Sequence, residues 1–158
     1  MAIETERKFL VKGDFKPFAF KAVRIMQGYL SSAPERTVRV RLRGERGYIT
    51  VKGPGSGSGV SRFEWEKEIP ADEAKALLEL AEPGVIDKTR YLVKGPDGVH
   101  TWEVDEFHGD NSGLIVAEVE LDCEDEPFAR PEWLGEEVTG QARYFNSMLA
   151  RNPFSNWK

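Results

Sequence analysis

The sequence predicts an α+β domain in which about eight antiparallel strands form a β-barrel with flanking helices. Strand-like segments follow one another at short spacing, and helix-like segments are few. Charged and apolar residues alternate along most of these strands, which places the charges of each strand on one face. A chain of 158 residues suits one domain with its own core, so we expect residues 1–158 to form a single domain.

Five strands and one ambiguous segment are expected in the first half of the chain. Residues 14–25 fit a short helix only if Pro17 lies in its first turn. Residues 36–43 and 47–52 make a hairpin, and the glycine-rich stretch 53–59 is a flexible connection. The strands are expected at residues 3–12, 27–30, 36–43, 47–52 and 60–69.

The second half begins with a helix at residues 72–81, which has an acidic start and is followed by Pro83 and Gly84. From Pro131 onward the chain is expected to be helical. Thr139 is the expected N-cap of a helix that runs to about Leu149. Further strands are expected at residues 86–94, 99–107 and 114–122.

The alternating charges are sorted by sign from strand to strand. Basic residues dominate 39–43 and 88–90, whereas acidic residues dominate four other segments. A solvated sheet face is the simpler explanation for any one strand, and cross-strand salt bridges can also sort charges. The alternating sets are Glu4, Glu6 and Lys8; Arg39, Arg41 and Arg43; Glu64, Glu66 and Glu68; Glu103 and Asp105; and Glu118 and Glu120.

The opposite faces of these strands are apolar and are expected to pack against helices outside the barrel. The charged faces then point either to solvent or into the barrel. A charged interior must be wide enough for water, ions or a ligand, because burying an unpaired charge costs several kcal/mol. Converging carboxylates suit Mg²⁺ or Mn²⁺, and Arg and Lys bind phosphate oxygens. A triphosphate held together with a divalent metal needs both kinds of group.

Composition sets limits on other functions. The net charge of −5 argues against nonspecific binding to nucleic acid. The single cysteine, Cys123, excludes an internal disulfide and a cysteine-cluster zinc site, and fits a reducing compartment. Because there is neither a membrane-length apolar run nor a secretion signal, we expect a cytoplasmic protein without a membrane partner.

An ordered set of motifs resembles the CYTH superfamily, also called the triphosphate tunnel metalloenzymes. The resemblance covers essentially the whole chain, and the order of the motifs makes it specific. It implies an eight-stranded antiparallel β-barrel, or tunnel, with a charged interior. The barrel agrees with the fold derived above, whereas the charged interior is implied only by the resemblance. The motifs are E-T-E-R-K at 4–8, R-V-R at 39–41, V-K-G at 51–53, E-W-E at 64–66, K-T-R-Y at 88–91, E-V-D at 103–105, E-V-E at 118–120 and V-T-G-x-x-R-Y at 138–144.

The resemblance also implies roles for individual residues. Lys52 and Tyr29 can form a proton-transfer pair, although Tyr29 can equally be a structural residue of the tunnel wall. Glu64 and Glu66 are expected to face inward, and Arg43 and Glu68 to lie at the rim. The metal-binding carboxylates are expected to be Glu4, Glu6, Asp105, Glu118 and Glu120, and the triphosphate clamp Lys8, Arg39, Arg41, Lys52, Lys88, Arg90 and Arg143.

The activity that the resemblance implies is metal-dependent hydrolysis of the terminal phosphate of a triphosphate, with Mg²⁺ or Mn²⁺ as cofactor. Inorganic tripolyphosphate is the favoured small-molecule substrate, and a homodimer is an open option. A nucleoside or thiamine triphosphatase and a class IV adenylate cyclase need the same clamp. A noncatalytic polyphosphate- or nucleotide-binding module and a plain barrel with a solvated charged face also stay open. His100 and His108 are expected to have a surface role, and Cys123 is expected to be a packed or surface thiol.

Overall fold

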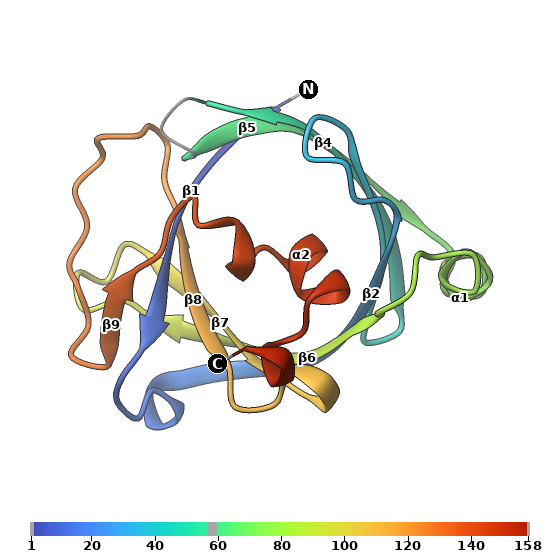
Figure 1. The fold of residues 1–158 in the computed structure, drawn as a ribbon. Helices are drawn as coiled ribbons and strands as arrows, with labels where there is room; N and C mark the ends of the chain where they lie inside the picture. The colour runs from blue at the N-terminus through green and yellow to red at the C-terminus, as the bar shows by residue number, and fades with distance from the viewer. Residues whose placement is uncertain (1, 57–59, 158) are drawn as a thin grey trace.

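A computed structural model of the chain describes residues 2–56 and 60–157, and its strands form a closed antiparallel barrel (Figure 1). The order around the barrel is β1-β5-β4-β3-β2-β6-β7-β8, and the pairing of β8 and β5 with β1 closes it. A ninth strand, β9 (Leu134–Glu137), pairs with the end of β1 outside the barrel. The barrel strands are β1 (Ala2–Val11), β2 (Ala19–Ser31), β3 (Thr37–Arg43), β4 (Arg46–Gly55), β5 (Ser61–Ile69), β6 (Ile86–Lys94), β7 (Thr101–Phe107) and β8 (Ile115–Glu120).

The ambiguous segment 14–25 is mostly strand. Pro17 lies in a short 3-10 helix, Lys16–Phe18, and β2 starts at once at Ala19. From there β2 pairs with β6 along most of its length, so its backbone groups gain more hydrogen bonds as a strand than a short helix would supply. In the glycine-rich stretch, Gly53–Gly55 belong to β4, whereas residues 57–59 lie outside the described residues.

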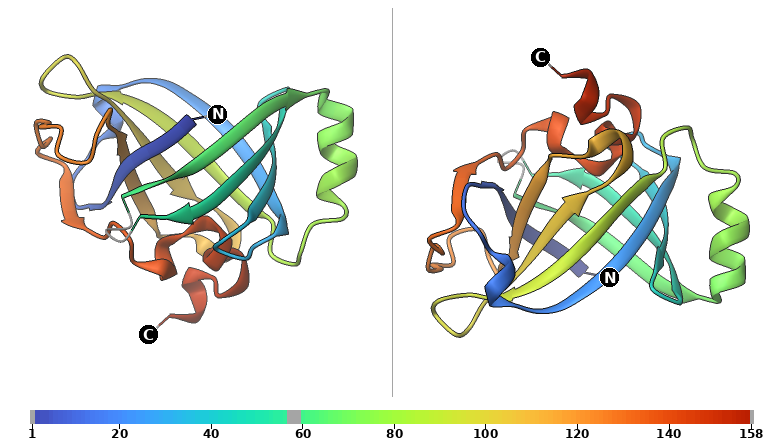
Figure 2. Two further views of the ribbon diagram at one scale, coloured as in Figure 1. Left: turned by 90° about the horizontal axis from the view of Figure 1, so that it is seen from above. Right: turned by 90° about the horizontal axis from the view of Figure 1, so that it is seen from below.

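The helix expected at 72–81 is confirmed as α1 (Ala71–Leu78), which lies outside the barrel against β3 and β4 (Figures 1 and 2). Glycine lets the helix approach the sheet closely. A Cβ atom on Gly47 would lie only 2.6 Å from the Cβ of Ala74. The sheet therefore bears a helix on this part of its outer surface, as the apolar strand faces predicted.

The long C-terminal helix predicted from Thr139 to Leu149 is wrong. The chain forms a 3-10 turn, Ala142–Tyr144, and then the short helix α2 (Asn146–Arg151). Thr139 is not an N-cap, because its hydroxyl accepts a hydrogen bond from the backbone N–H of Lys8 at 2.8 Å. We call residues 139–151 the C-terminal plug, because this segment lies across one end of the barrel (Figures 1 and 2).

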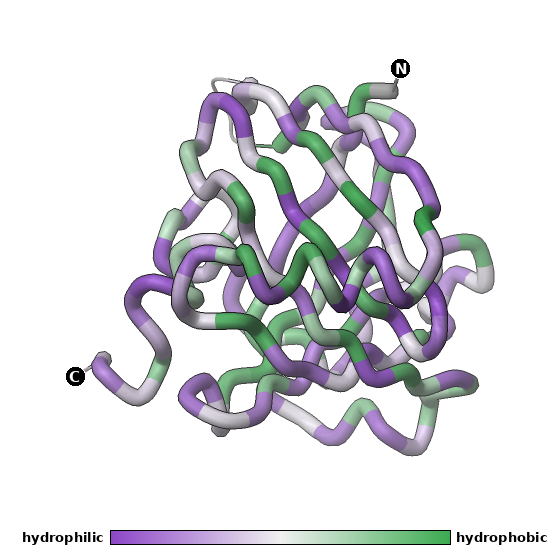
Figure 3. Tube along the Cα trace, turned by 90° about the vertical axis from the view of Figure 1, so that its right-hand side faces the viewer, coloured by the Kyte–Doolittle hydropathy of each residue, from purple (hydrophilic) through white to green (hydrophobic). Residues whose placement is uncertain are grey.

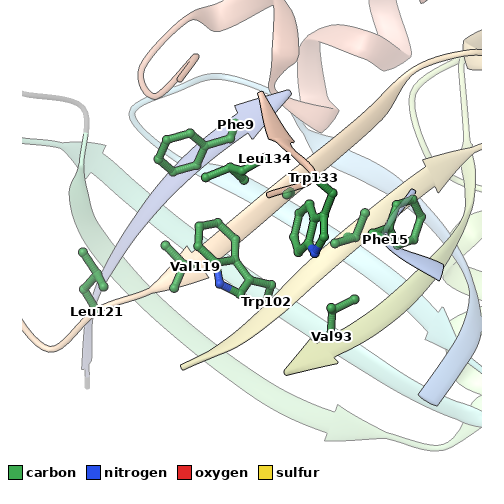
Figure 4. Packing of buried hydrophobic residues seen from close by; sticks show 10 residues of the cluster. Phe9, Phe15, Val93, Trp102, Val119, Leu121, Trp133 and Leu134 are labelled. Carbon is green, nitrogen blue, oxygen red and sulfur yellow. The ribbon is translucent and has the colours of Figure 1, made fainter. Parts of the chain in front are cut away.

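The first apolar core lies outside the barrel, on the outer faces of β1, β7 and β8 (Figure 4). Trp102 of β7 is fully buried there, between Phe9 of β1 and Trp133. The segment that covers it, residues 121–133, is irregular, so the expectation that helices alone cover the apolar faces is wrong. Aromatic side chains such as Trp133 and Phe128 supply the buried area that a helix would otherwise provide.

The second core fills one end of the barrel interior. Ile86, Phe107 and Val116 point inward from β6, β7 and β8 and pack against Tyr144 and Leu149 of the plug. Many of the remaining interior positions are charged, so purple and green residues alternate along the strands in Figure 3. Within residues 2–56 and 60–157, no helix has both the length and the apolar character that a membrane crossing requires.

Candidate active site

A cavity of about 520 Å³ occupies the barrel interior above the plug, and every barrel strand contributes to its wall. Alternation along the strands places the predicted residues there. In the β1–β8 pair, for example, Glu6 lies opposite Glu120, and Lys8 lies opposite Glu118. The cavity-lining residues that the sequence predicted as functional are Glu4, Glu6, Lys8, Tyr29, Arg39, Arg41, Lys52, Lys88, Arg90, Glu118 and Glu120.

One side of the cavity is an acidic wall formed by Glu4 and Glu6 of β1 and Glu118 and Glu120 of β8. Burial and the neighbouring charges of Glu118 and Glu4 raise the pKa of Glu6 well above its usual value. Burial likewise raises the pKa of Glu4 and Glu120. Like charges held this close together favour binding of either protons or a cation.

Glu118 behaves differently from its neighbours. Burial alone would raise its pKa, but the attraction of Lys8 and a hydrogen bond from Glu6 lower it to about 2. The two neighbouring carboxylates are therefore shifted in opposite directions, the pKa of Glu6 upward and that of Glu118 downward. A divalent cation between them would relieve the repulsion of their charges.

The opposite side is a basic wall formed by Arg39 and Arg41 of β3 and Lys88 and Arg90 of β6. Burial and the charges of Arg39 and Arg90 lower the pKa of Arg41 to about 9. Both Arg39 and Arg41 bury an Nε–H group that has no hydrogen-bond partner among the described residues. Leaving buried donors unpaired costs free energy, so these groups are poised for an anion with several acceptor oxygens.

Asp105 was predicted as a metal ligand, but it does not line the cavity. It is 2% exposed, and its two carboxylate oxygens accept hydrogen bonds from Arg90 at 2.8 and 2.9 Å. The ammonium of Lys88 lies 2.7 Å from the same carboxylate. With its oxygens thus engaged, Asp105 is placed to hold two cations of the basic wall in position.

Glu103 reaches the cavity from β7 in place of Asp105. It points to the same face two residues earlier in the strand, and its carboxylate lies 3.2 Å from Arg90. The motif match in E-V-D drew attention to the aspartate alone. The alternation of Glu103 with Asp105 was the signal that could have identified both.

Lys52 and Tyr29 both line the cavity, but no hydrogen bond joins them among the described residues. Burial would lower the pKa of Lys52, but the charges of Glu6 and Glu4 raise it instead. Its ammonium lies 2.8 Å from Glu4 and 3.5 Å from Glu64, so it stays charged. Tyr29 is buried, and its hydroxyl accepts a long hydrogen bond of 3.4 Å from Gln27.

Arg143, the last residue predicted for the clamp, lies outside the cavity. Its guanidinium stacks over the ring of Trp157 at 4.6 Å and donates a hydrogen bond to the hydroxyl of Tyr144 at 2.9 Å. The 3-10 turn that replaces the predicted helix directs this side chain away from the barrel interior. The guanidinium therefore contributes to packing against the outer side of the plug, not to the cavity wall.

Other cavity-lining residues were assigned elsewhere or missed. Arg43 lines the cavity although the sequence suggested a rim position, and Glu64 and Glu66 face inward as expected. Arg62 and Asn146 also line the cavity. Sequence reasoning missed them because neither lies within one of the matched family motifs. His100 is bound by Asp97 and Glu126, and Cys123 is exposed, as expected for residues outside the site.

The acidic wall is suited to a hard divalent cation such as Mg²⁺ or Mn²⁺, because its donors are all carboxylate oxygens. Within residues 2–56 and 60–157, no three acidic, histidine or cysteine side chains are close enough to form a preassembled metal site. Four carboxylates from the adjacent strands β1 and β8 nevertheless face one cavity, with Glu6 opposite Glu120 in the strand register. The residues present therefore fit the cation.

Comparison with known proteins agrees with this geometry. The family model for the CYTH domain matches residues 2–150. The chain belongs to the CYTH domain family. It is 47% identical over 159 residues to an inorganic triphosphatase of Acetivibrio thermocellus, across all of this chain and 99% of that protein. An inorganic triphosphatase of Nitrosomonas europaea is 41% identical over 93% of this chain and 96% of its own length.

Solved structures share the fold. The crystal structure of the inorganic triphosphatase NE1496 superimposes with a TM-score of 0.64 at 37% identity, covering 95% of each chain. The plant protein HpAC1 from Hippeastrum, at 15% identity and a TM-score of 0.60 over 76% of this chain and 80% of its own, shows the same fold. The barrel derived from the sequence is thus the barrel of this family.

Proposed function

We propose that this CYTH protein hydrolyses the terminal phosphoanhydride bond of inorganic tripolyphosphate. The observation that carries the proposal is the division of one buried cavity into an acidic wall and a basic wall. Two full-length relatives named as inorganic triphosphatases support the same substrate.

The basic wall would hold the phosphate chain. Arg39 and Arg41 offer the unpaired Nε–H donors of β3, and Lys88 and Arg90 face them from β6. Arginine binds phosphate through parallel hydrogen bonds, so this wall fixes both the register and the orientation of the chain. Lys8 lies between the two walls, with its ammonium 4.0 Å from Glu118.

The acidic wall would hold Mg²⁺ or Mn²⁺ through Glu4, Glu6, Glu118 and Glu120. Such a cation would supply positive charge that offsets the negative charge built up in the transition state. Asp105, which the motifs also suggested as a ligand, is better assigned to positioning Lys88 and Arg90. Glu103 lies in the cavity beside Arg90 and is a further candidate carboxylate.

The reaction requires a water oxygen to bond to the terminal phosphorus while the bridging P–O bond breaks and diphosphate leaves, and the proton that the water loses would pass to a cavity carboxylate or to solvent. Lys52 stays protonated next to Glu4 and Glu6, so it would offset negative charge or donate a proton rather than act as a base. We propose Tyr29 as a second proton donor, because its hydroxyl lines the cavity with only a long hydrogen bond from Gln27.

The test supplies purified protein with tripolyphosphate, ATP, GTP and thiamine triphosphate, each with Mg²⁺ or Mn²⁺. Phosphate, diphosphate and cyclic AMP are quantified over time. Selective release of phosphate from tripolyphosphate is the expected result. Preferred turnover of an organic triphosphate would instead indicate a nucleoside or thiamine triphosphatase, and cyclic AMP would indicate a cyclase.

Binding without turnover of any of these substrates would indicate a noncatalytic polyphosphate- or nucleotide-binding module. Absence of both binding and turnover would leave a barrel whose charges serve only the fold. The homodimer and the cytoplasmic location stay predictions, which size-exclusion chromatography with light scattering and cell fractionation can check.

A further inference from the structure

The floor of the cavity is made by the C-terminal plug, which touches the basic wall directly. Phe145, Asn146 and Ser147 of the plug line the cavity. The side-chain oxygen of Asn146 accepts a hydrogen bond of 2.9 Å from the ammonium of Lys88. This contact joins two residues 58 positions apart in the sequence and connects the end of the chain to the centre of the barrel.

Lys88 is 1% exposed, and its position is set from two sides. Asp105 Oδ2 lies 2.7 Å from the ammonium, and Asn146 Oδ1 lies 2.9 Å from it. A lysine ammonium has three N–H donors. Two are therefore engaged by these oxygens, and no described residue offers the third a hydrogen-bond acceptor, although the ammonium also lies 5.5 Å from the centre of the Phe107 ring. Lys88 lines the cavity.

The two partners of Lys88 differ in what they supply. Asp105 carries a negative charge that it shares with Arg90, so it compensates the charge of both cations. Asn146 is neutral and adds no charge to a cavity that is to receive an anion. Its contribution is directional, because a single acceptor oxygen on the plug limits the rotation of the ammonium.

We propose that Asn146 is a positioning residue, which directs the free N–H of Lys88 toward the bound phosphate chain and so makes the C-terminal plug part of the clamp. The inference rests on the proposed function for its choice of ligand. It does not require turnover, because the effect is on binding. A second link from the plug supports it, since the ammonium of Lys8 donates to the backbone oxygen of Tyr144 at 3.3 Å.

The experiment measures the Kd for tripolyphosphate by calorimetry and the KM and kcat for its hydrolysis with Mg²⁺. Loss of one directed hydrogen bond predicts that Asn146→Ala raises Kd and KM about 3- to 10-fold while kcat changes less. Asn152→Ala is the matched control, because Asn152 is an exposed asparagine that follows α2 outside the cavity. It should bind and turn over tripolyphosphate like the unaltered protein.

A double-mutant cycle separates positioning from a structural role. If Asn146 acts through Lys88, then Asn146→Ala has no further effect on Kd once Lys88→Met has removed the ammonium. Full additivity of the two changes would overturn the proposal. If Asn146→Ala lowers the melting temperature of the protein too far for binding measurements, Asn146→Ser can be used in the same cycle.

The outcomes also separate this inference from the proposed function. An unaltered protein that binds tripolyphosphate without hydrolysing it would contradict the proposed function, and the Kd values would still decide the role of Asn146. An active protein whose Asn146→Ala variant keeps the original Kd and KM would overturn the inference alone. Failure of the unaltered protein to bind tripolyphosphate would overturn both.

Discussion

The charges inside the barrel and the charges on its outer surface are arranged differently. Outside, a charge usually lies beside its opposite alone. Arg24 and Asp87 meet at 2.6 Å, and Arg7 and Glu137 also meet at 2.6 Å. Inside, ion pairs also occur, but like charges are close neighbours as well. Four glutamates share the acidic wall, and on the basic wall the charges of Arg39 and Arg90 help to lower the pKa of Arg41.

This difference suggests that the exterior pairs stabilise the fold, whereas the clustered interior charges bind a ligand. An exposed ion pair contributes about 0–1 kcal/mol and needs nothing else. Clustered like charges in a buried cavity destabilise the empty protein, so their retention points to a partner that supplies the missing charge. Substitutions of interior charges should therefore change stability and activity more than substitutions of exterior ones.

Asp105→Ala should have the largest effect, because it leaves Lys88 and Arg90 buried without their shared carboxylate. Removing one partner of a buried ion pair costs about 3–5 kcal/mol. For a chain of this size that corresponds to a decrease in Tm of about 10 °C. Calorimetry should show a far smaller change for Asp87→Ala, which breaks an exterior pair. Equal changes for the two variants would contradict the comparison.

Glu6→Gln should weaken metal-dependent activity at least about tenfold at limiting Mg²⁺, because it removes a charge from the acidic wall. Excess Mg²⁺ should restore part of the loss, and EDTA should abolish activity in the unaltered protein. Glu106→Gln, on the outer side of β7, is the control and should keep its metal dependence. Activity profiles against Mg²⁺ that coincide for Glu6→Gln and the unaltered protein would remove Glu6 from the metal site.

Arg41→Ala should raise the KM for tripolyphosphate about 10- to 100-fold, the amount expected for one charge-assisted hydrogen bond to phosphate. The exterior control is Arg24→Ala, for which KM should stay within about twofold of the original. Steady-state kinetics at saturating Mg²⁺ measure both. If Arg24→Ala impaired binding as strongly as Arg41→Ala, the effect would come from overall charge and not from the cavity.

Raising the pH should lower kcat/KM for tripolyphosphate at pH values where the protein is still folded. Burial lowers the pKa of Lys88 to about 8, despite the opposing attraction of Asp105. The ammonium is therefore lost as the pH rises through that value, and with it one phosphate contact. We expect kcat/KM to decline above about pH 8. A kcat/KM that stays constant to pH 10, with no unfolding by circular dichroism, would exclude a role for the charge of Lys88.

Arg143→Ala should have the smallest effect on activity. Its guanidinium lies over Trp157 outside the cavity, so the expected loss is a cation–π contact of about 0.5–1 kcal/mol in stability. The KM should stay within about twofold of the original. A large increase in KM would instead indicate that Arg143 binds the triphosphate, as the family motif suggested.

The barrel and the grouping of charges on one face of each strand could be predicted from sequence because they depend on a period of two, whereas the inward direction of that face followed from the family resemblance. Alternation along a strand fixes which side chains share a face, whatever the neighbouring strands do. Thus Glu4, Glu6, Arg39 and Arg41 were assigned together and lie together. Alternation does not predict how far along the barrel axis a residue lies. Asp105 was therefore assigned to the correct face of its strand, but it lies beyond the cavity.

The C-terminal segment was the part that sequence patterns misassigned. Its helical composition predicted one helix, but Thr139 bonds to the backbone of β1 and Gly140 adopts a positive φ of 77°. Both features depend on tertiary contacts that a local pattern cannot contain. The contact between Asn146 and Lys88 is of the same kind, since it joins two elements only after the barrel has closed.

The most direct test of the account is a crystal structure with tripolyphosphate and Mn²⁺, in which anomalous scattering locates the metal independently of the phosphates. The account predicts the Mn²⁺ peak among Glu4, Glu6, Glu118 and Glu120, with the phosphate oxygens on Arg39, Arg41 and Lys88. A structure in which metal and phosphates bind only on the outer surface of the barrel, and the interior cavity contains neither, would contradict it.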